Sequence, residues 1–157
     1  MPYFTFTTLT DPSVTGNTAT TATVSIAVSP SAGALTATNL LPGSSATGTI
    51  AVSNVGDVDV LYFLSADWRA AGTTTATLAS LLAHKLVISV EAGSPATTLY
   101  AGSLAGLIDQ PSPGGRSLAA ASAEDVRLTL LLPSGAGNVV QGLDLDIDFI
   151  FVAKQAV

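Results

Sequence analysis

The sequence predicts an all-β fold, a jelly roll or β-sandwich formed by one domain with one or two short helices. Three observations predict it. Segments with apolar residues at every second position recur along the 157 residues, a period typical of half-buried strands. Turn sequences rich in Gly, Pro and Asn separate these segments. Helical spacing is rare, and regularly spaced strands with hardly any helix are typical of sandwiches and jelly rolls.

Eight strands are expected. Val24, Ile26 and Val28 show the pattern, because all three fall on one face of an extended chain. Leucines at helical spacing predict a helix over residues 77–84, and a short helix or a turn is expected over 103–109. The predicted strands, in chain order, are residues 3–10, 18–28, 47–53, 58–66, 85–91, 97–101, 125–132 and 143–153.

The N-terminal segment is predicted to be an extended arm, residues 1–11, set off from a domain formed by residues 12–157. Its aromatic and Thr residues favour strand, and Asp11-Pro12 is interpreted as a break. Two alternatives are open: the arm is the first strand of its own domain, or it adds to an open sheet edge of a neighbouring subunit. The second is preferred. The residues expected at a subunit interface are Tyr3, Phe4, Phe6, Leu9 and Trp68.

The composition excludes several function classes. Charged residues make up only 10% of the chain and the net charge is −6, with five Lys and Arg together. Such a chain lacks the basic footprint that nucleic acid or an anionic membrane surface requires. No apolar run approaches the length of about 20 residues that spans a bilayer. Without Cys there is no disulfide scaffold, thiolate metal site or Cys nucleophile.

Several short motifs occur in a fixed order and spacing along nearly the whole chain, and most of them are turn sequences. They are Thr15-Gly16-Asn17-Thr18, Leu41-Pro42-Gly43-Ser44, Val52-Ser53-Asn54-Val55-Gly56, Leu99-Tyr100-Ala101-Gly102-Ser103-Leu104, Gly115-Arg116-Ser117-Leu118, Gly137-Asn138, Gln141-Gly142 and Asp148-Phe149-Ile150-Phe151. In this order the chain resembles the TasA/camelysin family of secreted biofilm-matrix proteins. The resemblance implies a jelly-roll domain that is secreted after signal cleavage and forms extracellular fibres by donor-strand complementation.

That family also carries a peptidase label through camelysin, and these residues do not support it. A zinc hydrolase needs about three protein ligands and a general base, whereas the chain has one His, His84. His84 is interpreted as a residue at a helix C-terminus or on the surface. A serine hydrolase would need a G-x-S-x-G elbow, which is absent. No catalytic residue and no cofactor are therefore predicted.

Two polar features near strand ends have competing interpretations. Asp144, Asp146 and Asp148 share one face of the last predicted strand. They are interpreted as a solvated face, with a subunit contact through Lys or Arg or a weak Ca²⁺ site as the alternatives. Trp68 and Arg69 are expected in a loop after a strand, where Trp68 covers the core edge or anchors an interface. Asp57 and Asp59 are assigned to a turn.

The sequence thus predicts a structural subunit of an extracellular filament, a homopolymer without enzymatic activity. It would be located outside the cell after removal of a signal peptide, and accessory or anchoring subunits are compatible with this function. The alternative is a secreted monomeric adhesin or binding module that uses the loops at 72–77 and 110–116.

Overall fold

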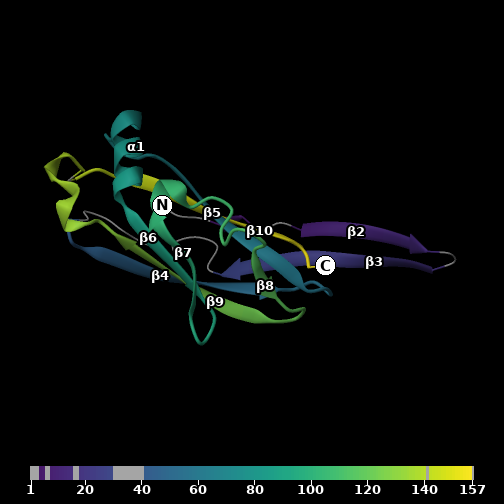
Figure 1. Ribbon diagram of the computed structural model, residues 1–157. Helices are drawn as coiled ribbons and strands as arrows, with labels where there is room; N and C mark the ends of the chain where they lie inside the picture. The colour runs from purple at the N-terminus through teal and green to yellow at the C-terminus, as the bar shows by residue number, and fades with distance from the viewer. Residues whose placement is uncertain (1–3, 6–7, 16–17, 30–40, 141, 157) are drawn as a thin grey trace.

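Two β-sheets pack face to face and confirm the predicted all-β sandwich (Figure 1). The computed structural model describes residues 4–5, 8–15, 18–29, 41–140 and 142–156, and within these ranges it describes side chains from residue 22 onward. One sheet has the strand order β1-β10-β5-β8, the other β2-β3-β4-β9-β6-β7. The strands are β1 (Phe4–Thr5), β2 (Thr8–Thr15), β3 (Thr18–Ser29), β4 (Ser45–Asn54), β5 (Val60–Ala70), β6 (Val87–Ala92), β7 (Thr97–Ser103), β8 (Arg116–Leu118), β9 (Ala123–Leu131) and β10 (Leu145–Gln155).

The core lies between the sheets because every second residue of the central strands points inward. Ile50 and Val52 of β4 and Phe149 and Phe151 of β10 are fully buried. Burial of one such side chain contributes about 1.5–3 kcal/mol, so the facing rows of apolar residues hold the sheets together. The alternation read from the sequence is therefore the pattern that builds the core.

One α-helix, α1 (Ala76–Lys85), covers one end of the sandwich. Its first turn is capped by the Thr75 hydroxyl, which accepts from the Leu78 N–H. Its buried residues are Ala79, Leu82 and Ala83, and its position confirms the helix predicted over 77–84. Three short 3₁₀ helices are η1 (Leu104–Gly106), η2 (Ser134–Ala136) and η3 (Asn138–Val140). No helix in the described ranges is both long and apolar enough to cross a membrane.

The strand predicted over 58–66 extends further, and this corrects the position of Trp68 and Arg69. Both residues lie within β5, where Trp68 pairs with Ile147 and Arg69 with Asp146 of β10. The β5–β10 ladder is continuous from Val60 to Ala70. The predicted strand stopped at Ala66, before the polar Asp67, although Asp67 lies on the outer face of a strand that continues to Ala70.

The N-terminal segment also differs from its predicted boundary. β2 continues through Asp11-Pro12 to Thr15 and pairs antiparallel with β3 of the same chain, so no break occurs there. Proline is tolerated on edge strands, and β2 is an edge of its sheet. β1 pairs parallel with β10 of the same chain, with Phe4 opposite Phe149.

Candidate functional site

The most unusual feature of the molecule is a two-stranded ribbon formed by β2 and β3. The strands pair from Thr8 opposite Ser25 to Thr15 opposite Thr18, whereas β4 pairs only with residues 26–29 of β3. Figure 1 shows the ribbon extending beyond the end of the sandwich. Among the described strands, none lies beside its outer half, residues 11–15 and 18–22.

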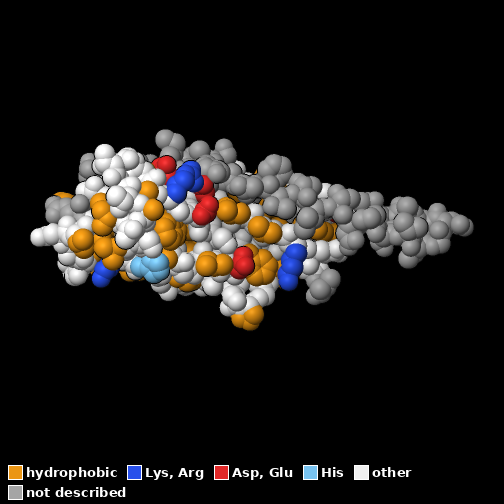
Figure 2. Space-filling view, turned by 90° about the horizontal axis from the view of Figure 1, so that it is seen from above, with side chains coloured by type: hydrophobic (Ala, Val, Ile, Leu, Met, Phe, Trp, Pro, Cys, Tyr) orange, Lys and Arg blue, Asp and Glu red, His pale blue; other side chains and the backbone are white. Residues whose placement is uncertain are grey.

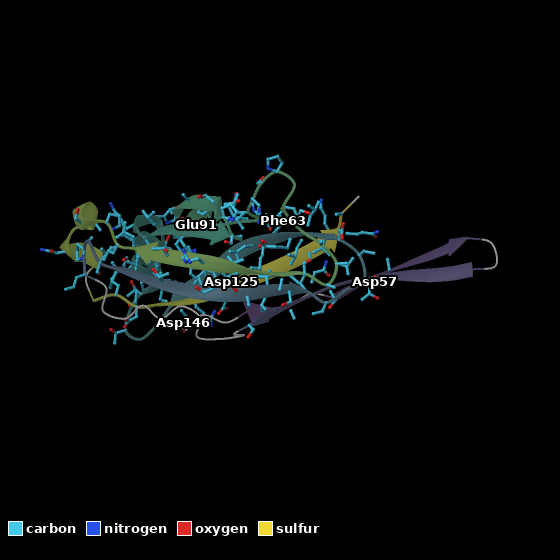
Figure 3. The ribbon with its side chains drawn as sticks, turned by 90° about the horizontal axis from the view of Figure 1, so that it is seen from below. Asp57, Phe63, Glu91, Asp125 and Asp146 are labelled. Carbon is cyan, nitrogen blue, oxygen red and sulfur yellow. The ribbon has the colours of Figure 1, made fainter. Side chains whose placement is uncertain are left out.

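The turn after β4 fixes the base of this ribbon to the sandwich. Its backbone donates from Val55 N to Ser25 O at 3.0 Å and from Asp57 N to Thr23 O at 3.2 Å. The Asp57 carboxylate accepts from the Thr23 N–H at 2.8 Å. Figure 3 shows Asp57 where the ribbon leaves the body of the protein. The assignment of Asp57 to a turn is confirmed. The hydrogen bonds between this turn and β3 extend the contact of the ribbon with the sandwich as far as Thr23.

Gly56 allows this close approach. A Cβ atom at Gly56 would lie 2.2 Å from the Thr23 carbonyl oxygen and 3.0 Å from the Ser25 nitrogen. Neither backbone atom can move without displacing β3. Any side chain at this position would therefore push the ribbon away from the sandwich.

Asn54 holds the turn in shape from inside. Its side chain is buried, donates to the carbonyls of Val58 at 2.8 Å and Leu118 at 3.1 Å, and accepts from the Gly56 N–H at 3.0 Å. A buried amide that forms three hydrogen bonds avoids the penalty of an unsatisfied polar group. The base of the ribbon is thus a rigid element tied to β8 of the other sheet.

At the opposite edge of the six-stranded sheet, β7 exposes an uncharged strand. Thr97, Thr98 and Ala101 are exposed. Tyr100 folds along the strand, with its hydroxyl donating to the Ser103 carbonyl at 2.8 Å. A Cβ at Gly102 would lie 2.7 Å from that hydroxyl oxygen, so glycine makes room for the ring.

Beside the β6–β7 turn the surface is hollowed by a groove of about 860 Å³. Its charged lining comes from β6, β8 and β9, and Glu91 and Asp125 are labelled in Figure 3. Because both signs of charge line the groove, it does not favour a ligand of one charge. The charged residues that line it are Glu91, Arg116, Glu124, Asp125 and Arg127.

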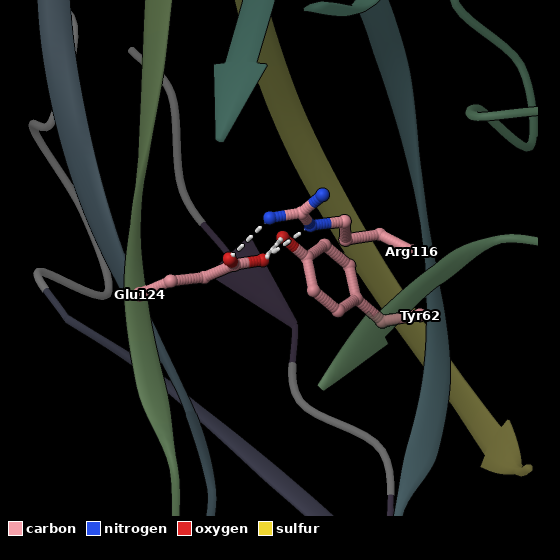
Figure 4. Close-up of polar contacts among 3 residues, drawn as sticks. All are labelled: Tyr62, Arg116 and Glu124. Carbon is pink, nitrogen blue, oxygen red and sulfur yellow. Dashed lines mark hydrogen bonds and ion pairs between the residues drawn. The ribbon is translucent and has the colours of Figure 1, made fainter. Parts of the chain in front are cut away.

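A polar triad crosses the core at this groove and links the two sheets (Figure 4). The Tyr62 hydroxyl on β5 donates to Glu124 Oε1 on β9 at 2.5 Å. Arg116 on β8 donates to both carboxylate oxygens, from Nε to Oε1 at 3.1 Å and from Nη2 to Oε2 at 2.9 Å. The bidentate geometry fixes the position of all three groups.

The electrostatics of the triad favour the ionised carboxylate. Burial by itself would raise the pKa of Glu124, but the hydrogen bonds from Arg116 and Tyr62 outweigh it and lower that pKa below its ordinary value of 4.5. Burial, reinforced by the neighbouring Glu124, raises the pKa of Tyr62. The hydrogen bond to Glu124 raises the pKa of Arg116. The phenol is therefore a neutral donor, and the triad is a structural link with no group poised to exchange a proton near pH 7.

The predicted aspartate row is not a uniform solvated face. Asp144 precedes β10, and its N–H donates to the Thr74 hydroxyl at 2.9 Å. Asp148 is buried, and its Oδ2 accepts from Arg69 Nη1 at 2.7 Å, while Asp146 Oδ2 lies 3.9 Å from Arg69 Nε. The basic partner expected from another subunit is thus Arg69 of the same chain. Among the described residues, no group of three or more His, Cys, Asp or Glu is placed to hold a metal ion.

The residues predicted at an interface are dispersed. Trp68 is half-buried against the core, and its ring contacts His84 of α1 edge to face, with centroids 6.5 Å apart. His84 Nδ1 also lies 2.7 Å from the Ser80 carbonyl oxygen, as expected for a helix C-terminal residue. Tyr3 and Phe6 lie outside the described residues. Phe4 belongs to β1 and Leu9 to β2, opposite Val24, with only their backbone described.

The triad was not predicted from the sequence, although Glu124 is one signal for it. Glu124 has the same strand parity as Val126 and Leu128, which points it toward the core. A charge at a core-facing position indicates a buried partner. Nothing in the sequence identifies that partner as Arg116 or indicates that Tyr62 takes part. Both residues lie in the four-stranded sheet, whereas Glu124 lies in the six-stranded one.

Neither protein-family models nor curated proteins give a match to this chain. The similarity to the TasA/camelysin family therefore stays an expectation that rests on the motifs.

Proposed function

We propose that this protein is a structural subunit of an extracellular filament, joined head to tail by donor-strand complementation. The observation that supports this most directly is the ribbon of β2 and β3, which has no third strand beside its outer half among the described residues. An isolated two-stranded hairpin is marginally stable in water. A strand or an edge from a second copy would complete it.

The N-terminal arm is suited to exchange between copies. β1 pairs with β10 over only two residues, Phe4 and Thr5. The same pairing can form with β10 of another copy, because exchange of an identical element between protomers requires no new kind of contact. If each copy gives its arm to the next and the two do not exchange arms as a pair, the contact is heterologous and propagates into a fibre.

Energetics indicate that backbone pairing alone is insufficient. An eight-residue edge offers roughly eight outward backbone groups, and each hydrogen bond contributes about 1 kcal/mol net. Association costs about 4–15 kcal/mol before any contact is favourable. Burial of Phe4 and Phe6 in the neighbour would add about 3–6 kcal/mol. The aromatic residues of the arm are therefore the part of the contact that decides whether fibres form.

The surface fits this function and an extracellular location. With 5 basic and 11 acidic residues in 157, copies repel one another weakly. Figure 2 shows how sparse the charged side chains are on one face of the protein. Few Lys and Arg also leave few sites for trypsin-like proteases, which suits a matrix exposed to secreted enzymes. The similarity to the TasA/camelysin family supports the same proposal, including secretion after removal of a signal peptide.

Negative-stain electron microscopy tests the proposal. We expect fibres from the full chain and folded monomers from residues 8–157, which lack β1 but keep the whole of β2. The double variant Phe4→Asp/Phe6→Asp should also stay monomeric. The matched control Thr5→Asp/Thr7→Asp adds the same charges to the alternate positions of the arm and should retain fibres. Normal fibres from the Phe double variant would exclude the arm as the connector.

A monomeric binding module is the alternative, and the groove beside the β6–β7 turn favours it. Arg116, at the end of the 110–116 loop, lines that groove. Molecular mass in solution separates the two functions, because the binding module would remain a monomer at every concentration. Absence of fibres from the full chain under all conditions would contradict the filament.

A further inference from the structure

We propose that the outer edge of β2 in one copy pairs with the β7 edge of the next, so that the six-stranded sheet continues from subunit to subunit. This inference rests on the proposed filament and assigns it a second contact, besides the arm. Its occupant is a second copy of this chain.

The strand order provides the geometry. β2 and β7 are the two edges of one sheet, with β3, β4, β9 and β6 between them. All five pairings in that series are antiparallel, so β2 and β7 run in opposite directions. A second copy in the same orientation, displaced sideways, therefore presents β7 antiparallel to β2. Antiparallel pairing is slightly more stable per residue than parallel pairing.

The same order prevents a subunit from satisfying its own edges. Neighbouring strands lie about 4.8 Å apart, so five intervals separate β2 from β7 by about 24 Å. Between copies, the β2 edge of one subunit meets the β7 edge of another; such a contact is heterologous, and a heterologous contact that does not close builds an open fibre. The projecting ribbon carries β2 beyond its own sandwich, where the next subunit has room.

The chemistry of the two edges permits the pairing. Natural proteins protect sheet edges with Lys, Pro or bulges. β7 contains no charged residue and no proline, and β2 contains one acid, Asp11, and no Lys or Arg. Only alternate residues of an edge strand direct their N–H and C=O groups outward, so β2 offers about four residues to a partner, and Pro12 removes at most one of their donors.

β7 also shows where on its edge the pairing would lie. Its register with β6 shifts at Leu99, the one residue of β7 that has no partner on β6. Tyr100 covers the end of the strand through its hydrogen bond to Ser103. Ala101 is exposed, pairs with Ser89 of β6 and lies in the continuous part of the ladder beyond the register shift. We therefore centre the contact on Ala101.

Cysteine cross-linking tests the contact directly, since the native chain has no Cys. Two double variants, Thr10→Cys/Ala101→Cys and Val14→Cys/Ala101→Cys, sample two registers of β2. Disulfides need Cα atoms within about 7 Å, which the separation of about 24 Å within one copy excludes. Oxidised fibres of at least one variant should give a ladder of covalent oligomers on denaturing gels. Val14→Cys/Ala119→Cys, with an exposed cysteine on the β8–β9 connection, is the matched control and should give none.

A charge variant gives the second readout. Ala101→Lys places a cation on the edge strand and should raise the protein concentration needed for fibres at least about tenfold. Ala96→Lys, at an exposed position in the β6–β7 turn, should leave it unchanged. Both variants should unfold at the wild-type denaturant concentration, because both sites are exposed.

The outcomes separate this inference from the proposed function. Fibres that form equally well with Ala101→Lys and give no ladder with either cysteine pair would overturn the β7 contact and leave the filament intact. Absence of fibres from the wild-type chain would overturn both. If Phe4→Asp/Phe6→Asp abolishes fibres while Ala101→Lys does not affect them and neither cysteine pair cross-links, the β7 contact is overturned and the arm is the sole connector.

Discussion

The link between the two sheets leads to a quantitative prediction for Arg116→Met. The Glu124 side chain is 11% exposed and keeps only the Tyr62 hydroxyl as a donor once the guanidinium is gone. Removing one partner of a fully buried ion pair costs about 3–5 kcal/mol, because the remaining charge is left uncompensated. Arg116 is itself 26% exposed, which places the cost near the lower limit, about 3 kcal/mol. For a domain of this size that corresponds to a fall in Tm of about 6–12 °C.

The assay is urea unfolding at pH 7, followed by circular dichroism, with the free energy of unfolding extrapolated to water. Arg127→Met is the matched control: it removes an exposed arginine of β9 and should cost less than about 0.5 kcal/mol. The triple variant Tyr62→Phe/Arg116→Met/Glu124→Leu replaces all three polar groups by apolar ones. It should recover to within about 1 kcal/mol of wild type, since apolar replacement of a buried pair is often neutral. An Arg116→Met variant as stable as Arg127→Met would refute the reasoning.

Two further predictions concern acid stability and the ribbon base. The pKa of Glu124 in the folded protein lies below its ordinary value of 4.5, so the unfolded chain binds a proton at this residue first as the pH falls. The stabilisation from Glu124 is therefore lost as pH falls from about 4.5 through the folded pKa. Glu124→Gln should therefore lose less stability than wild type between pH 5 and pH 3 in unfolding titrations; equal slopes would contradict the assignment. Gly56→Ala should cost about 1–3 kcal/mol and weaken amide protection at Thr23, because its Cβ would clash with the Thr23 carbonyl. Gly135→Ala, which meets open space, is the control, and equal effects of the two substitutions would show that the ribbon is not held at this turn.

The sequence was sufficient to predict the position of those strands that have one apolar and one polar face. β4 and β9 alternate between apolar and polar residues, and their predicted bounds differ from the observed ones by at most two residues. The helix was predicted over 77–84 and is observed over Ala76–Lys85, because its leucines have no alternation that competes with helical spacing.

The errors arose where tertiary pairing overrides a local signal. Asp11-Pro12 reads as a break, but β3 supplies a partner and the edge position tolerates proline. The aspartates near the C-terminus read as one solvated row, but Arg69 on the adjacent strand draws Asp148 into a buried ion pair. The signals in both cases are short range, whereas the partners of Asp11 and Pro12 lie 11 and 9 residues away along the chain and the partner of Asp148 lies 79 residues away.

The contact between Trp68 and His84 has a consequence for following the protein by light. The chain contains one Trp and one His, and the two rings meet where α1 lies on β5. The emission of this single Trp, excited at a wavelength that Tyr does not absorb, therefore reports whether the helix is docked, without any label. If α1 detaches before the sheets separate, the emission maximum shifts to longer wavelength while the strand signal in circular dichroism is unchanged.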